Sequence, residues 1–196
     1  TALIECAKQA QSIKADLKTS FGDKLPEGLH DAALYANDDE SEFQEKAKTV
    51  GILSTENEDV RSLRETVVFG CKGICAYAHH AAMLGFEKKE IYDQLVESMA
   101  SVTEDLSVDE MVAMVLKTGE NAVATMALLD EANTSTYGHP EITEVNIGVG
   151  TNPGILVSGH DLKDLQELLI QTEGKGIDIY THSEMLPAHY YPKLKT

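Results

Sequence analysis

The first two thirds of the chain carry apolar residues at spacings of three and four, which is the period of an amphipathic helix. Ile4, Ala7, Ala10 and Ile13 follow it near the N-terminus, and Met111, Met114, Val115, Val123 and Met126 follow it further on. The pattern predicts helices, with only short connections between them. Their expected ranges are 2–18, 38–52, 57–83, 86–105 and 108–133.

Capping residues mark where several of these helices begin and end. Ser107 and Glu110 form the S-x-x-E pattern of a capping box, in which each side chain accepts a hydrogen bond from the other residue's backbone amide. Thr55 is expected to cap the helix over 57–83, and Gly85 is expected to terminate it. Residues 1–135 are therefore predicted to form a helical bundle domain.

The pattern changes near Thr134, where turn-forming residues replace the helical period. Short apolar runs over 145–150, 154–159 and 176–181 predict strands, and an amphipathic helix is expected over 161–172. A strand, a helix and a strand in that order predict a βαβ unit with parallel strands. The fold class is thus mainly α, a helical bundle followed by the first βαβ portion of a truncated Rossmann-like parallel sheet. Residues 136–196 are expected to be the start of this second, α/β domain.

The chain carries a net charge of -17, which disfavours nucleic acid and anionic membrane surfaces as partners. No stretch is expected to cross a membrane, and no secretory leader is recognisable. Three cysteines, Cys6, Cys71 and Cys75, predict reduced thiols in a cytoplasmic protein. The chain begins without Met in a helical pattern and ends shortly after a proline, so we expect it to be an internal part of a longer protein.

Two side chains are expected at the carboxyl edge of the predicted sheet, where parallel sheets place their functional groups. His160 follows the strand ILVS directly, and Glu184 follows the strand ending in YTHS. Spacing alone also allows a simpler interpretation, in which His160 caps the following helix and Glu184 is a solvated loop acid. If both strands lie side by side, the imidazole and the carboxylate approach one another.

Long stretches of the chain resemble the hybrid cluster protein family, also called the prismane or hydroxylamine reductase family. They are LSTENEDVRSLRE, DLSVDEMVAMV, TMALLDEANTSTYG and the whole of 140–192, which contains GHDL and SEMLPA. The resemblance extends from about Phe43 onward and is weaker before it. The family often has glycine where this chain has Ser183.

The resemblance implies that His160 and Glu184 bind iron in a mixed iron–sulfur–oxygen cluster, the hybrid cluster. It also implies a parent enzyme that reduces hydroxylamine or nitric oxide under nitrosative stress, with a second, [4Fe–4S]-type cluster. The family's N-terminal cysteine motif, its downstream cysteines and its second glutamate are missing here. We therefore expect no cofactor and no activity in the isolated chain, whose partners are the remainder of the parent chain, a small nitrogenous substrate and an unknown electron donor.

Other candidates carry less weight. Cys71, Cys75 and His79 recur every four residues on one predicted helix, which suits a soft metal ion, although packing of small side chains is the stronger interpretation. GVGTNPG at 148–154 lacks the lysine of a phosphate-binding loop and is interpreted as a turn between two strands. Asp161 is a helix N-terminal acid or a partner of the His160 imidazole. The residues near Glu184 that are candidates to line a cluster cavity, with packing equally plausible, are His182, His189, Tyr190 and Tyr191.

Two other functions remain open at this point. A carbon monoxide dehydrogenase-like subunit has a related fold, but its nickel–iron cluster uses more cysteines, and the SEMLPA glutamate argues against it. A metal-free helical interaction module is the alternative from a different class. Metal analysis of the parent protein distinguishes all three.

Overall fold

The computed structural model describes residues 2–22, 30, 31, 35, 37 and 39–195. The chain divides into two compact units, Thr1–Ser62 and Leu63–Thr196. The first unit contains α1 (Ala2–Phe21), α3 (Glu40–Val50) and the short 3-10 helix η2 (Ile52–Ser54). Asp39 caps α3 by accepting a hydrogen bond from the Ser41 amide at 2.9 Å.

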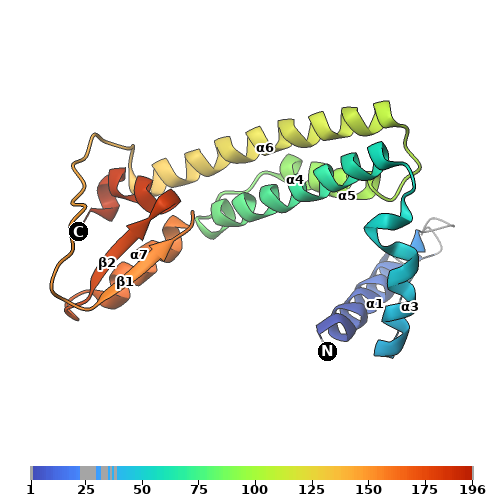
Figure 1. Cartoon of the computed structure of the whole chain (residues 1–196), viewed down its shortest axis with the longest axis horizontal. Coiled ribbons are helices and arrows are strands. Elements are labelled where there is room, and N and C mark those ends of the chain that lie inside the picture. Colours follow the sequence, from blue (N-terminus) through green and yellow to red (C-terminus); the bar gives the residue numbers. More distant parts are fainter. Residues whose placement is uncertain (1, 23–29, 32–34, 36, 38, 196) are drawn as a thin grey trace. The chain divides into compact units, whose positions relative to one another are not determined.

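The helices of the second unit are α4 (Glu58–Met83), whose first residues belong to the first unit, α5 (Lys89–Ser101) and α6 (Val108–Tyr137). They lie side by side in Figure 1. Within the second unit, the buried residues of α4 recur at alternating steps of four and three, which forms one continuous apolar stripe. They are Val67, Cys71, Ile74, Ala78 and Ala81. Other buried apolar residues of the helical core include Ile91 and Leu95 of α5 and Met111 and Leu128 of α6.

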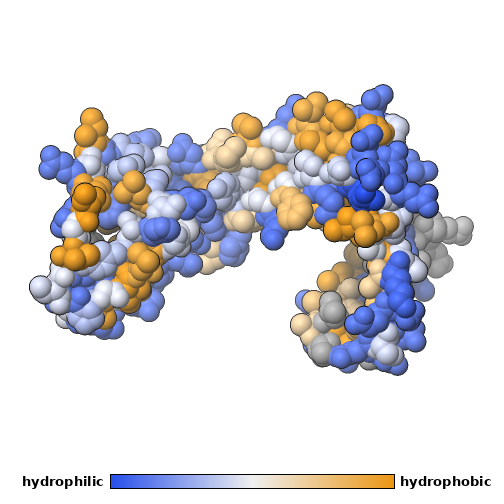
Figure 2. All heavy atoms as spheres, viewed as in Figure 1, coloured by the Kyte–Doolittle hydropathy of each residue, from blue (hydrophilic) through white to orange (hydrophobic). Residues whose placement is uncertain are grey.

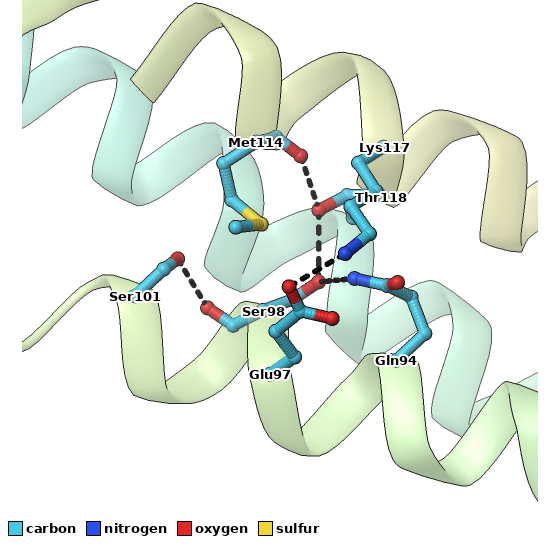
Figure 3. Close-up of polar contacts among 7 residues, drawn as sticks. All are labelled: Gln94, Glu97, Ser98, Ser101, Met114, Lys117 and Thr118. Carbon is cyan, nitrogen blue, oxygen red and sulfur yellow. Dashed lines mark hydrogen bonds and ion pairs between the residues drawn. The ribbon is translucent and has the colours of Figure 1, made fainter. Parts of the chain in front are cut away.

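Buried polar side chains join α5 to α6 within this helical layer (Figure 3). The hydroxyls of Ser98 and Thr118 lie 3.2 Å apart, and Gln94 donates a hydrogen bond to Ser98. Thr118 also donates to the Met114 carbonyl at 2.9 Å, so its hydroxyl is satisfied although it is buried. A Cβ at Gly70 of α4 would lie 3.0 Å from the Thr118 methyl, so the helices approach closely here.

The α/β part follows α6 and contains β1 (Gly154–Ser158), α7 (Leu162–Thr172) and β2 (Asp178–His182). Two 3-10 helices, η3 (Ser183–Tyr190) and η4 (Pro192–Leu194), complete it. β1 and β2 pair in parallel, from Gly154 opposite Asp178 to Ser158 opposite His182. Their core consists of Tyr137, Leu162, Leu165, Met185, Ala188 and Leu194. The predicted fold class is confirmed, and the described residues of 57–130 contain no strand.

Three local predictions are wrong. Residues 145–150 are not a strand, because Ile147 and Val149 point into solvent and the Asn146 side chain accepts from the Gly148 amide in a local turn. The cap of α4 is Asn57, not Thr55, since its side chain accepts from the Asp59 and Val60 amides. The change of pattern at Thr134 does not end α6.

α6 continues to Tyr137 because the Tyr137 ring is buried in the α/β core, and the helix ends where Gly138 adopts a φ of 90°. The end of the last long helix thus belongs to the core of the α/β part. The division of the chain into domains at residues 135 and 136 stays a prediction.

By length and composition alone, α6 is apolar enough to cross a membrane, so the expectation that no stretch meets this criterion is wrong. This is weak evidence, because a core helix of a helical bundle meets the same criterion. α6 packs against α5 and buries the polar residues Thr118, Asn121 and Thr125.

Many large apolar side chains of the second unit are exposed, and they form the orange patches of its surface in Figure 2. On the helices they include Phe69, Val96, Leu116 and Val123, and in the α/β part Ile142, Ile147, Val149 and Leu156. Isolated exposed apolar residues are normal, but a concentration of them marks a surface that contacts other protein.

Candidate metal centre

His160 and Glu184 occupy equivalent places at the carboxyl edge of the sheet. The last pair of the parallel ladder is Ser158 opposite His182, and each candidate ligand lies two residues beyond its member of this pair. The residue that separates the end of each strand from its candidate ligand has a positive φ, 119° at Gly159 and 51° at Ser183. Both strands therefore end in the same kind of turn, and both turns present a polar side chain at one edge.

The positive φ at Ser183 favours glycine, which is the residue that the family resemblance implies at this position. Ser183 is the only described non-glycine residue with a positive φ, a conformation that L-residues rarely adopt. We expect Ser183→Gly to stabilise the turn by about 1 kcal/mol, less what the lost hydroxyl contributes.

Gly159→Ala should destabilise the equivalent turn by about 1–2 kcal/mol, because no Cβ is tolerated easily at its φ although space is open around it. Chemical denaturation measures the change in the free energy of unfolding for both variants, and amide hydrogen exchange in β1 and β2 measures the local change. Equal stability of Gly159→Ala and the unsubstituted chain would contradict this.

The His160 side chain is exposed and makes no hydrogen bond to any described residue. Its ring lies against Tyr77 of α4, with centroids 5.9 Å apart and an angle of 58° between the planes. Asp161 caps α7, since its Oδ1 accepts from the Lys163 and Asp164 amides at 2.8 and 3.1 Å. The interpretation of His160 as the helix cap is therefore wrong, and Asp161 is confirmed as the helix N-terminal acid.

Glu184 is exposed at the start of η3. A hydrogen bond from the Ser183 hydroxyl, followed by one from the Glu184 amide, holds the pKa of this carboxyl below its usual value. His160 and His182 lower this pKa further through smaller electrostatic effects. The carboxylate and the His160 imidazole are thus within electrostatic reach across the sheet edge.

Of the other candidates near Glu184, His189 and Tyr191 contact neighbouring side chains, and His182 lies at the sheet edge. His189 contacts the Thr181 hydroxyl through Nε2 at 2.8 Å, and the Tyr191 ring packs edge-on against Tyr137 at 6.2 Å. Burial raises the pKa of Tyr191. His182 is exposed at the edge itself, where its Nδ1 lies 3.1 Å from the Ser158 hydroxyl. His182 is therefore the member of this set nearest to the two candidate ligands along the sheet edge.

Cys71, Cys75 and His79 do not form a metal site. Cys71 is buried, and burial raises the pKa of its thiol, whereas Cys75 and His79 are exposed. The two cysteines line an apolar hollow with Val68, Lys72, Leu95, Val96 and Met99. Across the described part of the chain, no group of three His, Cys, Asp or Glu side chains is placed to hold a metal ion.

The glycines of 148–154 serve close packing rather than phosphate binding. The Gly150 amide donates to the Tyr180 hydroxyl at 2.8 Å, and a Cβ at Gly154 would lie 2.7 Å from the Tyr180 ring. The segment contacts β2 and leads directly into β1. No described strand precedes β1, so the segment is not a turn between two strands. The prediction of a turn between two strands is wrong for the same reason as the strand at 145–150.

The sequence analysis did not connect two residues of α4 with the turn that carries His160, although His80 adjoins the candidate His79. They are Tyr77, which contacts the His160 ring, and His80, whose Nε2 lies 3.6 Å from Asp161 Oδ2. Their spacing of three on α4 places them on one helix face, but no sequence signal links that face to a turn that lies 80 residues further along.

The Prismane/CO dehydrogenase family matches residues 2–196. The hydroxylamine reductase of Nitratidesulfovibrio vulgaris is 63% identical over 188 residues, covering 96% of this chain and 34% of that protein. The hydroxylamine reductase of Desulfosudis oleivorans is 57% identical over 195 residues, covering 98% and 36%. That of Acetivibrio thermocellus is 61% identical over 170 residues, covering 86% and 31%.

The chain thus spans about a third of the length of these curated relatives. The relatives all carry the name hydroxylamine reductase, so the carbon monoxide dehydrogenase-like alternative is not favoured. The resemblance carried by GHDL and SEMLPA is confirmed: the chain belongs to the Prismane/CO dehydrogenase family.

Proposed function

We propose that the chain is part of an oxidoreductase that reduces hydroxylamine or nitric oxide, and that His160 and Glu184 bind iron of its hybrid cluster. The observation that carries the proposal is the equivalent placement of these two side chains, each two residues beyond the last pair of the parallel ladder. The names of the relatives supply the reaction class.

The two side chains fit iron chemically. The imidazole makes no hydrogen bond to a described residue, and the carboxylate is exposed, so both have lone pairs available for a metal. Imidazole and carboxylate are harder ligands than thiolate, and they suit iron sites that also accept oxygen or nitrogen ligands. His160 and Glu184 would hold the iron at the sheet edge, and the bound cluster would supply the electrons for the reduction.

The remaining ligands belong to other parts of the parent protein in this proposal. A hybrid cluster needs several cysteines and a second glutamate, and a second iron–sulfur cluster needs its own cysteine motif, according to the family resemblance. The exposed apolar residues of the second unit provide surface for the remainder of the parent chain. The protein is proposed to be cytoplasmic, to act under nitrosative stress, and to bind neither nucleic acid nor membrane.

Metal analysis of the full-length protein tests the proposal. We expect iron together with acid-labile sulfide and oxygen-bridged iron sites, and no nickel. Iron with nickel would favour a carbon monoxide dehydrogenase-like protein, and no metal would favour an interaction module.

The isolated 196-residue chain serves as the matched comparison. It should be colourless and inactive and should lose iron on desalting, because it offers two ligands. Stoichiometric iron and sulfide in this chain would contradict the proposed division of the ligands.

A further inference from the structure

The C-terminal turns of α4 contact the turn that carries His160 at two points. The Tyr77 ring lies 5.9 Å from the imidazole of His160, centroid to centroid. One turn further along the helix, His80 Nε2 lies 3.6 Å from Asp161 Oδ2. The two α4 rings are themselves 6.0 Å apart, so they form one aromatic surface facing the turn.

His80 approaches the residue next to His160. Asp161 Oδ1 accepts two amides at the start of α7, which holds the carboxylate, and its Oδ2 faces His80 at 3.6 Å. The side chains of His80 and Asp161 are 20% and 22% exposed, so this contact is largely shielded from water. His80 Nδ1 is buried without a hydrogen-bond partner among the described residues, and such an atom is retained only at a cost.

The contact from Tyr77 restricts the His160 ring itself. An exposed histidine without a hydrogen bond normally samples several rotamers, which costs conformational entropy when a metal fixes one of them. The neighbouring Tyr77 ring, tilted by 58° to the imidazole plane, excludes part of that range. Metal-ligating histidines in other proteins are usually oriented by a hydrogen bond to the second ring nitrogen. Here the ring contact with Tyr77 takes that place.

We propose that Tyr77 and His80 are positioning residues that hold the His160 turn in the orientation required for iron. The inference rests on the proposed role of His160 as a ligand. In this proposal α4 does more than pack against its neighbours, because it also orients the His160 side chain at the sheet edge. Neither residue is proposed as an iron ligand.

The contact is first tested in the 196-residue chain without any cluster. Nuclear Overhauser effects between the Tyr77 and His160 rings are expected, because rings at this separation bring protons within range. Their absence in the unsubstituted chain overturns the proposal. Tyr77→Leu should shift the His160 ring protons towards the values of a free histidine, whereas Tyr77→Phe should leave them unchanged.

His80→Leu should broaden or shift the His160 and Asp161 resonances, and His79→Leu is its matched control, since His79 is the exposed neighbour on the same helix. Unchanged His160 resonances in both Tyr77→Leu and His80→Leu overturn the proposal. Resonances of the Tyr137 and Tyr191 rings report whether a variant still folds. If a variant does not fold, the Overhauser effects of the unsubstituted chain still test the contact.

In the full-length protein, Tyr77→Leu should alter the paramagnetic resonance spectrum or midpoint potential of the hybrid cluster at unchanged iron content, and Tyr77→Phe should restore both. If His160→Ala abolishes this spectrum while Tyr77→Leu leaves it unchanged, the positioning role is wrong and the ligand assignment stands. If His160→Ala leaves the spectrum unchanged, the ligand assignment fails, whatever the contact shows.

Discussion

Replacing His160 with Ala in the full-length protein should abolish the spectrum of the hybrid cluster and the reduction of hydroxylamine. The loss should be at least about 100-fold, because even residues that only orient metal ligands change metal affinity or activity about 10- to 100-fold. Glu184→Ala should have the same effect, since its carboxylate sits at the equivalent place on the adjacent strand. The second iron–sulfur cluster proposed for the parent protein would have its own ligands, so it should survive both substitutions.

The matched controls are His79→Ala and Glu173→Ala, which remove an exposed imidazole and an exposed carboxylate elsewhere in the same unit. Both should retain spectrum and activity. Persistence of both clusters and of activity in His160→Ala or Glu184→Ala would show that the ligand assignment is wrong. Glu184 would then be the solvated loop acid that spacing alone allowed.

The location of the candidate site could be predicted because it depends on sequence-local features. GHDL and SEMLPA each follow a short apolar run, and parallel pairing brings the ends of consecutive strands to one edge. The capping box at Ser107 and the helix end at Gly85 were likewise readable, since each involves residues within one turn of the helix.

The errors arise where distant residues decide the outcome. The apolar alternation of 145–150 is typical of a strand, but a strand forms only if a partner offers its backbone. Instead, the Gly150 amide donates to the Tyr180 hydroxyl, and the side chain of Asn152, just beyond the segment, donates to Asp178. The link of Tyr77 and His80 to the His160 turn escaped notice because helical periodicity identifies a face without identifying what lies against it.

Replacing Tyr137 with Ala should destabilise the α/β part by about 3–5 kcal/mol, the usual cost of removing a fully buried aromatic side chain. Tyr137 is 1% exposed, contacts the Tyr191 ring, and belongs to the core that joins the end of α6 to α7 and η3. Hydrogen exchange should accelerate in α7 and β2 more than in α4 and α5, whose core is separate. Tyr137→Phe, which keeps the ring, should lose about 1 kcal/mol or less, because the only hydrogen bond of the hydroxyl to a described residue, Gln166, is long at 3.4 Å.

The same residue should make the stability of the chain depend on alkaline pH. Burial, with smaller contributions from the negative charges of Asp161 and Glu167, raises the pKa of Tyr137 from 10.0 to about 12. In the unfolded chain the phenol ionises near its ordinary pKa, while in the folded chain it stays neutral to higher pH. The resulting stabilisation is therefore fully present below pH 10 and is lost as the pH rises towards about 12.

A shift of this size corresponds to a change on the order of 2 kcal/mol in the free energy of unfolding across that window. Denaturation at a series of pH values from about 9 to about 12 measures this change, because the series spans the ordinary and the raised pKa of the phenol. The alkaline loss should be smaller in Tyr137→Phe than in the unsubstituted chain, because phenylalanine has no proton to release. Parallel curves for the two proteins would mean that the Tyr137 phenol ionises as easily in the folded chain as in the unfolded one, and that its hydroxyl is not shielded by the core.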